Sequence, residues 1–280
     1  MATIGIIHPG EMGVSVGAAA RANGHRVLWA SAGRSAATKA RALEAQFEDA
    51  ETLADLLVQA EVVVSICPPH AALDVAGEVA GCAYQGIYLD ANAIAPTTAR
   101  AVAAPITEAG ASFVDGGIIG PPAYKPEMTR LYLSGDKASV VAALFEGTPL
   151  EPITLGDALG KASALKMAYA AWTKGTSALL LAVNALAKHE AIEQPLFDEW
   201  QRSLPELVGR SKSVTTQTLR KAWRFAGEMR EIAQTFEQAG LPAGFHSAAA
   251  ELYERLETFK DVAKADADAV LERLLEPDAS

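Results

Sequence analysis

The segment that most constrains the fold is the first thirty residues, where a glycine turn separates two short apolar runs. Residues 1–8 are apolar enough for a buried strand, and Pro9 and Gly10 end that run before a helix rich in small residues begins. A second strand is predicted over residues 24–30, about one helix further on. Together these segments predict a βαβ unit of the kind that cradles a phosphate.

The glycine turn offers a binding place for a pyrophosphate. Gly10 lets the backbone approach a phosphate, and Gly13 and Gly17 let the helix pack close to the sheet. The free N–H groups and the dipole of the helix start attract an anion. The first glycine of the usual motif is a histidine here, and a structural role for that histidine stays open. We expect dinucleotide contacts from His8, Pro9, Gly10, Glu11 and Met12.

The loop after the second predicted strand indicates which dinucleotide binds. It reads Ser-Ala-Gly-Arg-Ser over residues 31–35, and the next carboxylate along the chain is Glu44. Enzymes that use NAD place Asp or Glu at this strand end to bind the ribose hydroxyls. Arg34 can instead pair with a 2′-phosphate and lie over the adenine. We therefore expect NADP(H), held by Ser31, Gly33, Arg34 and Ser35, although Ser35 can also be the N-cap of the next helix.

Composition narrows the class of protein further. The chain has 280 residues, half of them apolar, which suffices for a substantial core and two domains. Its net charge of −10 argues against a nucleic-acid partner. Cys67 and Cys82 lack metal-ligand spacing and form no disulfide framework, so we expect no metal and a cytoplasmic location. No signal peptide is recognisable, and charged residues interrupt the most apolar stretch, residues 162–187, so we expect no membrane contact.

Strand and helix patterns alternate as far as residue 156. This alternation predicts an α/β fold, a Rossmann-type doubly wound parallel sheet. A loop rich in glycine and proline is expected directly after residue 115. Further strands are predicted over residues 61–66, 86–90, 112–115, 130–134 and 152–155, with helices over residues 96–109 and from about residue 137.

After Gly156 the strand patterns end, and an all-α domain is predicted. Residues 157–189 contain no proline and predict one long interdomain helix, which is apolar on nearly every face and needs cover from other helices. We expect some of that cover from a second copy of the chain, in a homodimer. Further helices are predicted over residues 195–203, 205–239 with breaks, and 242–260, before an acidic tail. The expected domains are residues 1–156, which bind NADP, and residues 157–280, which bind substrate and dimerise.

Four short stretches carry a resemblance to a known family. They are His-Pro-Gly-Glu-Met-Gly at residues 8–13, Asp-Ala-Asn at residues 90–92, Asp-Gly-Gly-Ile-Ile-Gly-Pro at residues 115–121, and Gly-Lys-Ala-Ser-Ala-Leu-Lys at residues 160–166. In these stretches the chain resembles the β-hydroxyacid dehydrogenases, whose relatives are the 6-phosphogluconate dehydrogenases and imine reductases. It looks closest to a branch with a divergent C-terminal helical domain. The resemblance covers the N-terminal domain and the start of the long helix.

The resemblance implies that Lys166 is the catalytic lysine. Hydride transfer at a carbinol carbon needs a proton donor and acceptor beside the alcohol oxygen. A lysine can serve if burial and the positive nicotinamide lower its pKa. Tyr169 and Thr173 follow at three and seven residues on the same helix face, so they could hydrogen-bond to the amine or the substrate, and Tyr169 is a second catalytic candidate.

Further candidates, most of them implied by the resemblance, are expected around the nicotinamide and the substrate. Two polar residues of the family pattern are missing, since Ile119 stands for a serine and Ala170 for an asparagine. The substrate can therefore differ from a simple 3-hydroxy acid. Asn92 is also an ordinary turn residue, and His246 a possible helix cap. The expected neighbours of the nicotinamide are Cys67, Pro68 and Asn92, and those of the substrate are Asn92, Ile119, Gly120, Pro121, Thr173 and His246.

The sequence thus predicts an NADP(H)-dependent oxidoreductase of the β-hydroxyacid dehydrogenase type, with a small hydroxy or keto acid as substrate and Lys166 as general acid and base. Two alternatives stay open. An NADPH-dependent imine reductase generally carries aspartate or tyrosine at the lysine position, and the nearby Tyr169 keeps that function open. A non-catalytic protein that binds NADP(H) would suit the polar groups lost at Ile119 and Ala170.

Overall fold

The chain folds into two compact units, residues 1–167 and 168–280. The computed structural model describes residues 1–260, 262 and 266–276, with residues 216–221 described by their backbone alone. The boundary between the units lies inside the helix α7 (Lys161–His189), which therefore contributes its first turns to the first unit. The domain boundary expected at Gly156 stays a prediction.

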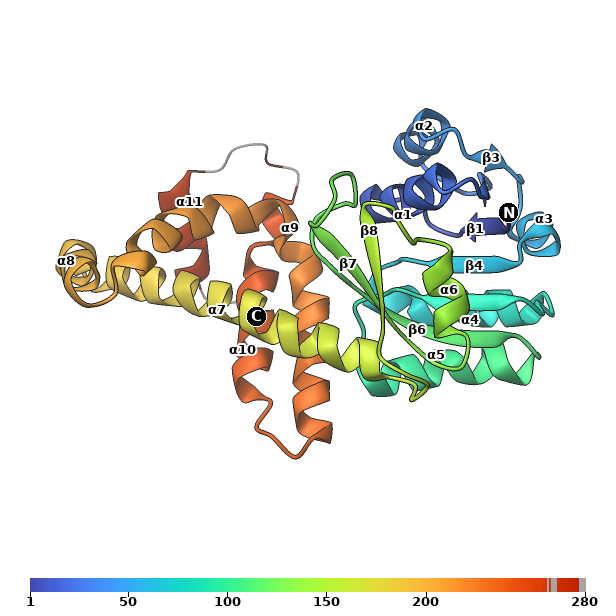
Figure 1. The fold of residues 1–280 in the computed structure, drawn as a ribbon. Coiled ribbons are helices and arrows are strands. Elements are labelled where there is room, and N and C mark those ends of the chain that lie inside the picture. Colours follow the sequence, from blue (N-terminus) through green and yellow to red (C-terminus); the bar gives the residue numbers. More distant parts are fainter. Residues whose placement is uncertain (261, 263–265, 277–280) are drawn as a thin grey trace. The chain divides into compact units, whose positions relative to one another are not determined.

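The first unit is built on one eight-stranded sheet with the order β3-β2-β1-β4-β5-β6-β7-β8 (Figure 1). The strands from β1 to β6 are parallel, β7 is antiparallel to β6, and β8 is parallel to β7. The predicted α/β class, a Rossmann-type domain followed by helices, is confirmed. The strands are β1 (Thr3–Ile6), β2 (Arg26–Trp29), β3 (Glu48–Asp49), β4 (Val62–Ser65), β5 (Ile87–Asp90), β6 (Ser112–Ile119), β7 (Thr129–Ser134) and β8 (Leu150–Thr154).

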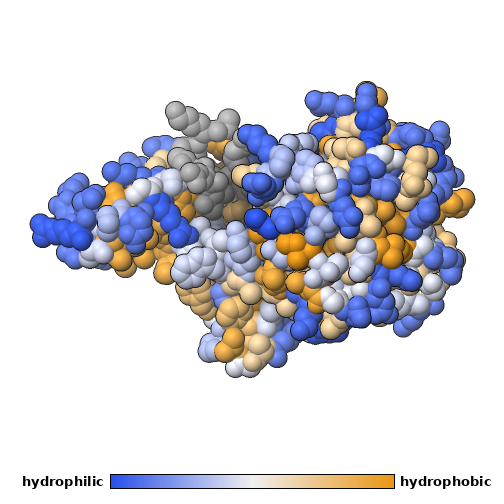
Figure 2. All heavy atoms as spheres, in the orientation of Figure 1, coloured by the Kyte–Doolittle hydropathy of each residue, from blue (hydrophilic) through white to orange (hydrophobic). Residues whose placement is uncertain are grey.

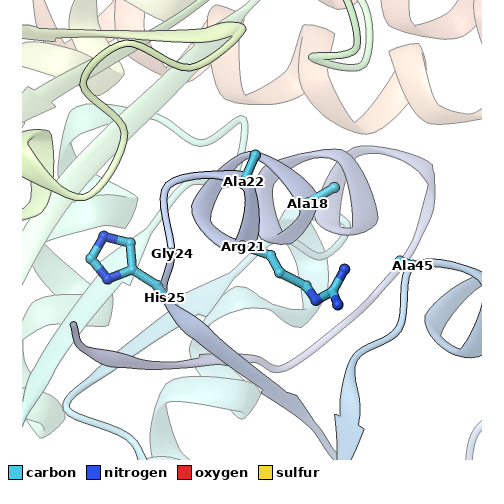
Figure 3. A pocket seen from close by; sticks show the side chains of 6 residues that line it. All are labelled: Ala18, Arg21, Ala22, Gly24, His25 and Ala45. Atoms are coloured by element: carbon cyan, nitrogen blue, oxygen red, sulfur yellow. The ribbon is translucent and has the colours of Figure 1, made fainter.

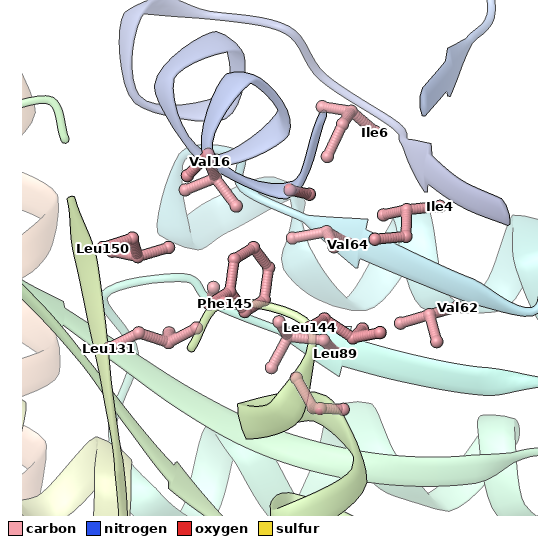
Figure 4. Close-up of a cluster of buried hydrophobic side chains, with 14 of the residues drawn as sticks. Ile4, Ile6, Val16, Val62, Val64, Leu89, Leu131, Leu144, Phe145 and Leu150 are labelled. Atoms are coloured by element: carbon pink, nitrogen blue, oxygen red, sulfur yellow. The ribbon is translucent and has the colours of Figure 1, made fainter. Parts of the chain in front are cut away.

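Both faces of this sheet are buried, because successive side chains of a strand point to opposite faces. Val62 and Val64 belong to one hydrophobic cluster, together with Ile6 and Phe145 (Figure 4), and Val63 belongs to the other. Each such side chain contributes about 1.5–3 kcal/mol when fully buried.

The helices of this unit are α1 (Glu11–Ala22), α2 (Ala36–Glu44), α3 (Leu53–Gln59), α4 (Ala72–Gly81), α5 (Pro96–Glu108) and α6 (Ala138–Ala143), with the short 3₁₀ helix η1 (Pro69–Ala71).

Strand β6 is longer than predicted, and the expected loop directly after residue 115 is wrong. The strand continues to Ile119, which pairs with Arg130 of β7. A Cβ on Gly116 would lie 2.7 Å from the Asp90 carbonyl oxygen, and one on Gly117 would lie 2.8 Å from the Ala162 carbonyl oxygen. These glycines therefore mark close approaches of the backbone rather than a turn.

The second unit is helical. It contains the rest of α7, then α8 (Glu193–Ser203), α9 (Pro205–Gln238), α10 (Gly244–Arg255), the 3₁₀ helix η2 (Glu257–Phe259) and α11 (Ala267–Leu275). Helices α9 and α10 form an antiparallel hairpin (Figure 1). Two predictions were wrong here. Breaks were expected within residues 205–239, but α9 is continuous. No helix was predicted in the acidic tail, but α11 lies there, and its Val270, Leu271 and Leu274 are buried.

Inside this unit, Asn184 of α7 and Ser211 of α9 hydrogen-bond reciprocally. The Asn184 amide donates to the Ser211 carbonyl at 3.1 Å, and the Ser211 hydroxyl donates to Asn184 Oδ1 at 2.7 Å.

None of the helices in the described residues has the length and hydrophobicity of a membrane span. Hydrophobic residues nevertheless interrupt the hydrophilic surface of each unit (Figure 2).

Candidate dinucleotide and active site

The candidate residues of the first unit lie where parallel strands end. The carboxyl ends of β1, β2, β4 and β5 share one edge of the sheet, because these strands run in the same direction. Chain segments that leave this edge supply the residues predicted to bind the dinucleotide. Ligands of open α/β sheets bind at such an edge.

The glycine turn at the end of β1 has the form of a phosphate cradle. Gly10 is the N-cap of α1, and no side chain caps this helix. A Cβ on Gly13 would lie 2.3 Å from the His8 carbonyl oxygen, so only glycine permits this packing of helix against turn. A Cβ on Gly10 would meet no atom within 4 Å, so the backbone there is open to a ligand. Uncapped helix N–H groups beside an open turn fit a pyrophosphate.

His8 is a neutral imidazole at this turn. Burial and the charge of Arg34 lower the pKa of His8 to about 4. Among the described residues, its buried Nδ1 has no hydrogen-bond partner. An orphaned buried polar atom costs free energy until it finds a partner, so His8 is suited to hydrogen-bond a ligand.

The loop over residues 31–35 brings a guanidinium to the same edge. Arg34 is partly buried, and its buried Nε has no partner within the described part of the chain. Ser35 caps α2, since its hydroxyl accepts from the Thr38 backbone N–H at 3.3 Å. Sequence reasoning missed Arg41, whose Nε donates to the Pro9 carbonyl at 3.4 Å and so lies against the glycine turn.

The structure also places a carboxylate beside this loop, where the sequence predicted none. Asp49 ends the two-residue strand β3, and its Oδ1 accepts from the backbone N–H groups of Ser31 at 3.2 Å and Glu51 at 2.8 Å. Although Glu44 is the next carboxylate along the chain, the carboxylate that lies beside this loop is therefore that of Asp49. Nothing in the local pattern revealed Asp49, because both residues of β3 are exposed and neither is apolar.

Asn92 forms hydrogen bonds with residues at the ends of both β4 and β5. Its Oδ1 accepts from the Cys67 backbone N–H at 2.5 Å, and its Nδ2 donates to Asp90 Oδ2 at 2.9 Å and to the Ser65 hydroxyl at 3.4 Å. Asp90 is buried, and its pKa rises to about 7 through burial and the charge of Asp115. Asn92 is thus itself a buried structural group, and its contact with a ligand stays a prediction. Burial also raises the pKa of the Cys67 thiol to about 11, so this thiol is not a nucleophile at neutral pH.

The amine of Lys166 lies against β6 at the start of α7. Its Nζ donates to the Ile118 carbonyl at 2.5 Å. Burial lowers the pKa of Lys166 to about 8. A Cβ on Gly117 would lie 3.1 Å from Lys166 Cβ, so the lysine projects past a position where only glycine fits. A lysine whose pKa is close to the working pH can both accept and donate a proton.

Three buried polar residues that the sequence did not single out tie the beginning of α7 to the sheet. Asp115 of β6 accepts from the Ser163 backbone N–H at 3.0 Å, from the Ser163 hydroxyl at 2.5 Å and from the Ser134 hydroxyl at 2.8 Å. The Ser134 hydroxyl in turn accepts from the Ala162 backbone N–H at 3.2 Å. This arrangement is a helix N-cap supplied by two neighbouring strands. Both serines are far from Asp115 in sequence, and no local signal reveals the contact.

The remaining predicted residues are spread over both units. In the first, Ile119 is a buried residue of β6, and the exposed Gly120 follows it with φ +130°. In the second, Tyr169 is 50% exposed, and the Thr173 hydroxyl donates to the Tyr169 carbonyl at 3.2 Å. His246 is buried, with its ring 4.2 Å from that of Phe236, and burial lowers its pKa.

A surface hollow of about 450 Å³ lies at the other end of α1, between that helix and the start of β2 (Figure 3). Arg21 and His25 line it, together with small residues. Figure 3 shows that these two side chains point in different directions. The His25 Nδ1 already accepts from the Ala2 backbone N–H at 3.1 Å. The hollow therefore gathers no set of groups that converge on one ligand.

The architecture and the open glycine turn define a dinucleotide-binding α/β protein. Residues 3–144 match a family model described as the NAD binding domain of 6-phosphogluconate dehydrogenase, and the chain belongs to that family. The resemblance stated from the four sequence stretches is confirmed, and so is a nicotinamide dinucleotide as the class of cofactor. A second family model, described as a domain of unknown function (DUF1932), matches residues 187–256.

Individual relatives resemble the chain over much of its length. An uncharacterized 28.5 kDa protein of Methanothermus fervidus is 35% identical over 179 residues, and the match covers 64% of this chain and 66% of that protein. A conserved hypothetical protein from Sinorhizobium meliloti is 27% identical, with a TM-score of 0.70 and coverage of 98% of this chain and 97% of that one.

More distant solved structures share the fold. The 3-hydroxyisobutyrate dehydrogenase of Mycobacterium tuberculosis has a TM-score of 0.71 at 19% identity, with coverage of 99% of this chain and 100% of that one. An imine reductase of Streptomyces aurantiacus has a TM-score of 0.56 at 18% identity, with coverage of 98% and 100% respectively.

Proposed function

We propose that the protein is an NADP(H)-dependent oxidoreductase of the β-hydroxyacid dehydrogenase type, in which Lys166 moves the proton. The observation that carries this proposal is the partly buried amine, held 2.5 Å from the Ile118 carbonyl, in a unit that belongs to a dinucleotide-binding family. The dehydrogenase among the fold neighbours supports the class of reaction.

The chemistry divides between the cofactor and this chain. The bound dinucleotide supplies or accepts the hydride. In the oxidising direction the neutral Lys166 amine takes the proton of the substrate hydroxyl while the carbinol carbon loses the hydride, and a ketone or aldehyde forms. In the reducing direction the ammonium returns that proton to the carbonyl oxygen. Because the Lys166 pKa is lowered to about 8, oxidation should accelerate as pH rises through 8 and reduction should slow.

NADP(H) is the cofactor that Arg34 favours. Its guanidinium has a buried Nε without a partner in the described residues, and a 2′-phosphate oxygen is a suitable acceptor. Asp49 opposes this choice by its charge, but two backbone N–H groups already occupy its Oδ1. Titration by cofactor fluorescence should give at least tenfold tighter binding of NADPH than of NADH, and Arg34→Gln should remove that preference. Equal affinities in the wild type would refute NADP(H) specificity.

The decisive activity experiment compares two lysines of one helix. Lys166→Met should lower turnover of 3-hydroxy acids by at least a hundredfold and leave dinucleotide affinity within threefold. Lys161→Met is the matched control, because Lys161 is the exposed first residue of α7. Turnover that survives Lys166→Met would refute the catalytic assignment. If the wild type binds NADPH but turns over no hydroxy acid, keto acid or imine, it is a binding protein.

An imine reductase is the second candidate. The half-exposed Tyr169 offers a phenol on the same helix, and the buried Ile119 supplies no polar partner for a substrate carboxylate. Cyclic imines tested beside hydroxy acids, both with the NADPH couple, separate the two functions. Loss of imine reduction in Tyr169→Phe, with Lys166→Met still active, would favour the reductase.

We propose a homodimer formed through the helical unit. Trp172, Leu179 and Leu186 recur every seven residues on α7 and are 70%, 50% and 57% exposed. Such a stripe on one helix suits a partner helix. Light scattering should report twice the chain mass for the wild type and half that value for Leu179→Glu, whereas a monomeric wild type would refute the dimer.

A further inference from the structure

We propose that Asp115 is a positioning residue for the Lys166 amine, which it holds against β6 by capping the first turn of α7. The inference rests on the proposed function where it names this amine as the reacting group. The position of the amine can be tested without turnover.

The cap and the lysine form two attachments between the same pair of elements. Asp115 and Ile118 are three residues apart on β6, and Ser163 and Lys166 are three residues apart on α7. Asp115 binds Ser163, and Ile118 accepts from Lys166. Three residues span about 10 Å along a strand but only about 4.5 Å along a helix. The lysine side chain reaches from α7 to the Ile118 carbonyl of β6, so the position of Nζ depends on where the cap fixes the helix start.

The cap has no substitute if the carboxylate is removed. Asp115, Ser134 and Ser163 are each about 1% exposed or less, so bulk solvent does not reach the lost acceptor's place. Three donors, the Ser163 N–H and the hydroxyls of Ser163 and Ser134, would be left without it. Unpaired buried donors are costly, and the first turn of α7 would have to move to relieve them.

A direct electrostatic role for Asp115 predicts the opposite result. The charged and titratable groups on the elements around this turn are Asp115 on β6, Tyr88 and Asp90 on β5, Arg130 and Tyr132 on β7, and Arg100 of α5, whose guanidinium nitrogen would lie 3.0 Å from a Cβ on Gly160. Removing the Asp115 charge at fixed geometry would disfavour the ammonium and lower the Lys166 pKa. Releasing the amine to water would raise this pKa, because burial is what lowers it. The sign of the change therefore distinguishes positioning from charge.

The test measures the reactivity of the Lys166 amine in the intact protein. Acetic anhydride labels lysines from pH 6 to pH 11, peptide mass spectrometry reads each site, and the exposed Lys161 is the internal reference. Asp115→Ala should raise the Lys166 pKa by one unit or more and lower its labelling at pH 8, relative to its own plateau at high pH, at least fivefold. The conservative Asp115→Asn should shift it less, and Asp136→Ala, which removes an exposed carboxylate of the same unit, should leave it unchanged.

A folded Asp115→Ala protein with an unchanged or lowered Lys166 pKa would overturn the proposal. If Asp115→Ala does not fold, Asp115→Asn and Ser163→Ala decide, each with a smaller rise expected and with no rise as the refuting result. The proposed function fails separately, when Lys166→Met keeps its turnover. Where the wild type is active, Asp115→Asn should lower kcat at least tenfold with KM and NADPH affinity within threefold.

Discussion

Replacing Asp90 with asparagine should make the first unit more stable at high pH relative to the wild type. Burial and the neighbouring Asp115 raise the Asp90 pKa from 3.8 to about 7. The folded protein therefore binds one more proton than the unfolded chain between these two values. Stability is lost as pH rises through that window, because folding then has to keep a buried carboxyl protonated or bury its charge.

The magnitude follows from the shift. A shift of one pKa unit is worth about 1.4 kcal/mol. With pKa values of 3.8 in the unfolded chain and about 7 in the folded one, the wild type should lose roughly 2–3 kcal/mol between pH 5 and pH 9 through Asp90. Asparagine cannot titrate, so Asp90→Asn escapes this loss. It still forfeits the hydrogen bond that Asp90 Oδ2 accepts from Asn92, which costs about 1 kcal/mol at every pH.

Hydrogen exchange of the β4 and β5 segments measures this effect inside the first unit. The difference in unfolding free energy, Asp90→Asn minus wild type, should grow by roughly 2–3 kcal/mol from pH 5 to pH 9. Asp74→Asn, which changes an exposed carboxylate of α4, is the control. A difference that stays constant with pH would show that Asp90 is ionised throughout and would refute the reasoning.

Three further predictions concern glycines and a histidine. Gly10→Ala should leave the melting temperature unchanged and weaken NADPH binding at least tenfold in a fluorescence titration, whereas Gly13→Ala should also lower the melting temperature, because its Cβ would lie 2.3 Å from a carbonyl oxygen. Gly117→Ala should lower kcat at least tenfold at unchanged NADPH affinity, since its Cβ would lie 2.8 Å from the Ala162 carbonyl oxygen of α7. His246→Phe should remove acid sensitivity of the second unit: burial lowers the His246 pKa, so wild-type stability should fall below about pH 6.5, as thermal melts can check.

The sequence predicted those parts of the fold that local patterns encode. The β1 turn, α1 and the buried strand β4 follow from apolar runs and glycine spacing, and the structure has each of them. Strand β3 escaped prediction because two exposed polar residues carry no period. Helix α9 was expected to break, yet it runs unbroken through Gly209 and Gly227 because tertiary packing overrides local propensity.

The candidate site was predictable to the same depth. The turn at Gly10 and the position of Lys166 came from short motifs, but the groups that hold them did not. Asp115 reaches Ser163 across 48 residues and Ser134 across 19 residues, and such pairs exist only once the sheet is formed. The glycines at 116 and 117 were misread for the same reason, since a close approach depends on a distant partner and a turn does not.

Because Asp90 and Asp115 are buried, the residues that would contact the substrate can differ from the family pattern without moving the Lys166 amine. Asp90 and Asp115 are paired across β5 and β6. Asp90 accepts a hydrogen bond from Asn92, and Asp115 accepts one from the start of α7. Their polar contacts are internal to the protein, so they constrain the substrate only through the residues that they position. The resemblance implies that the serine and asparagine replaced by Ile119 and Ala170 belong to the other class, groups that would meet the substrate itself. A chain that keeps the buried carboxyls but lacks this serine and asparagine should retain hydride and proton transfer. It should also accept a less polar carbonyl or alcohol as substrate. Comparing kcat/KM for a 3-hydroxy acid and its methyl ester tests this: the ester should be the better substrate, and a preference for the free acid would contradict the argument.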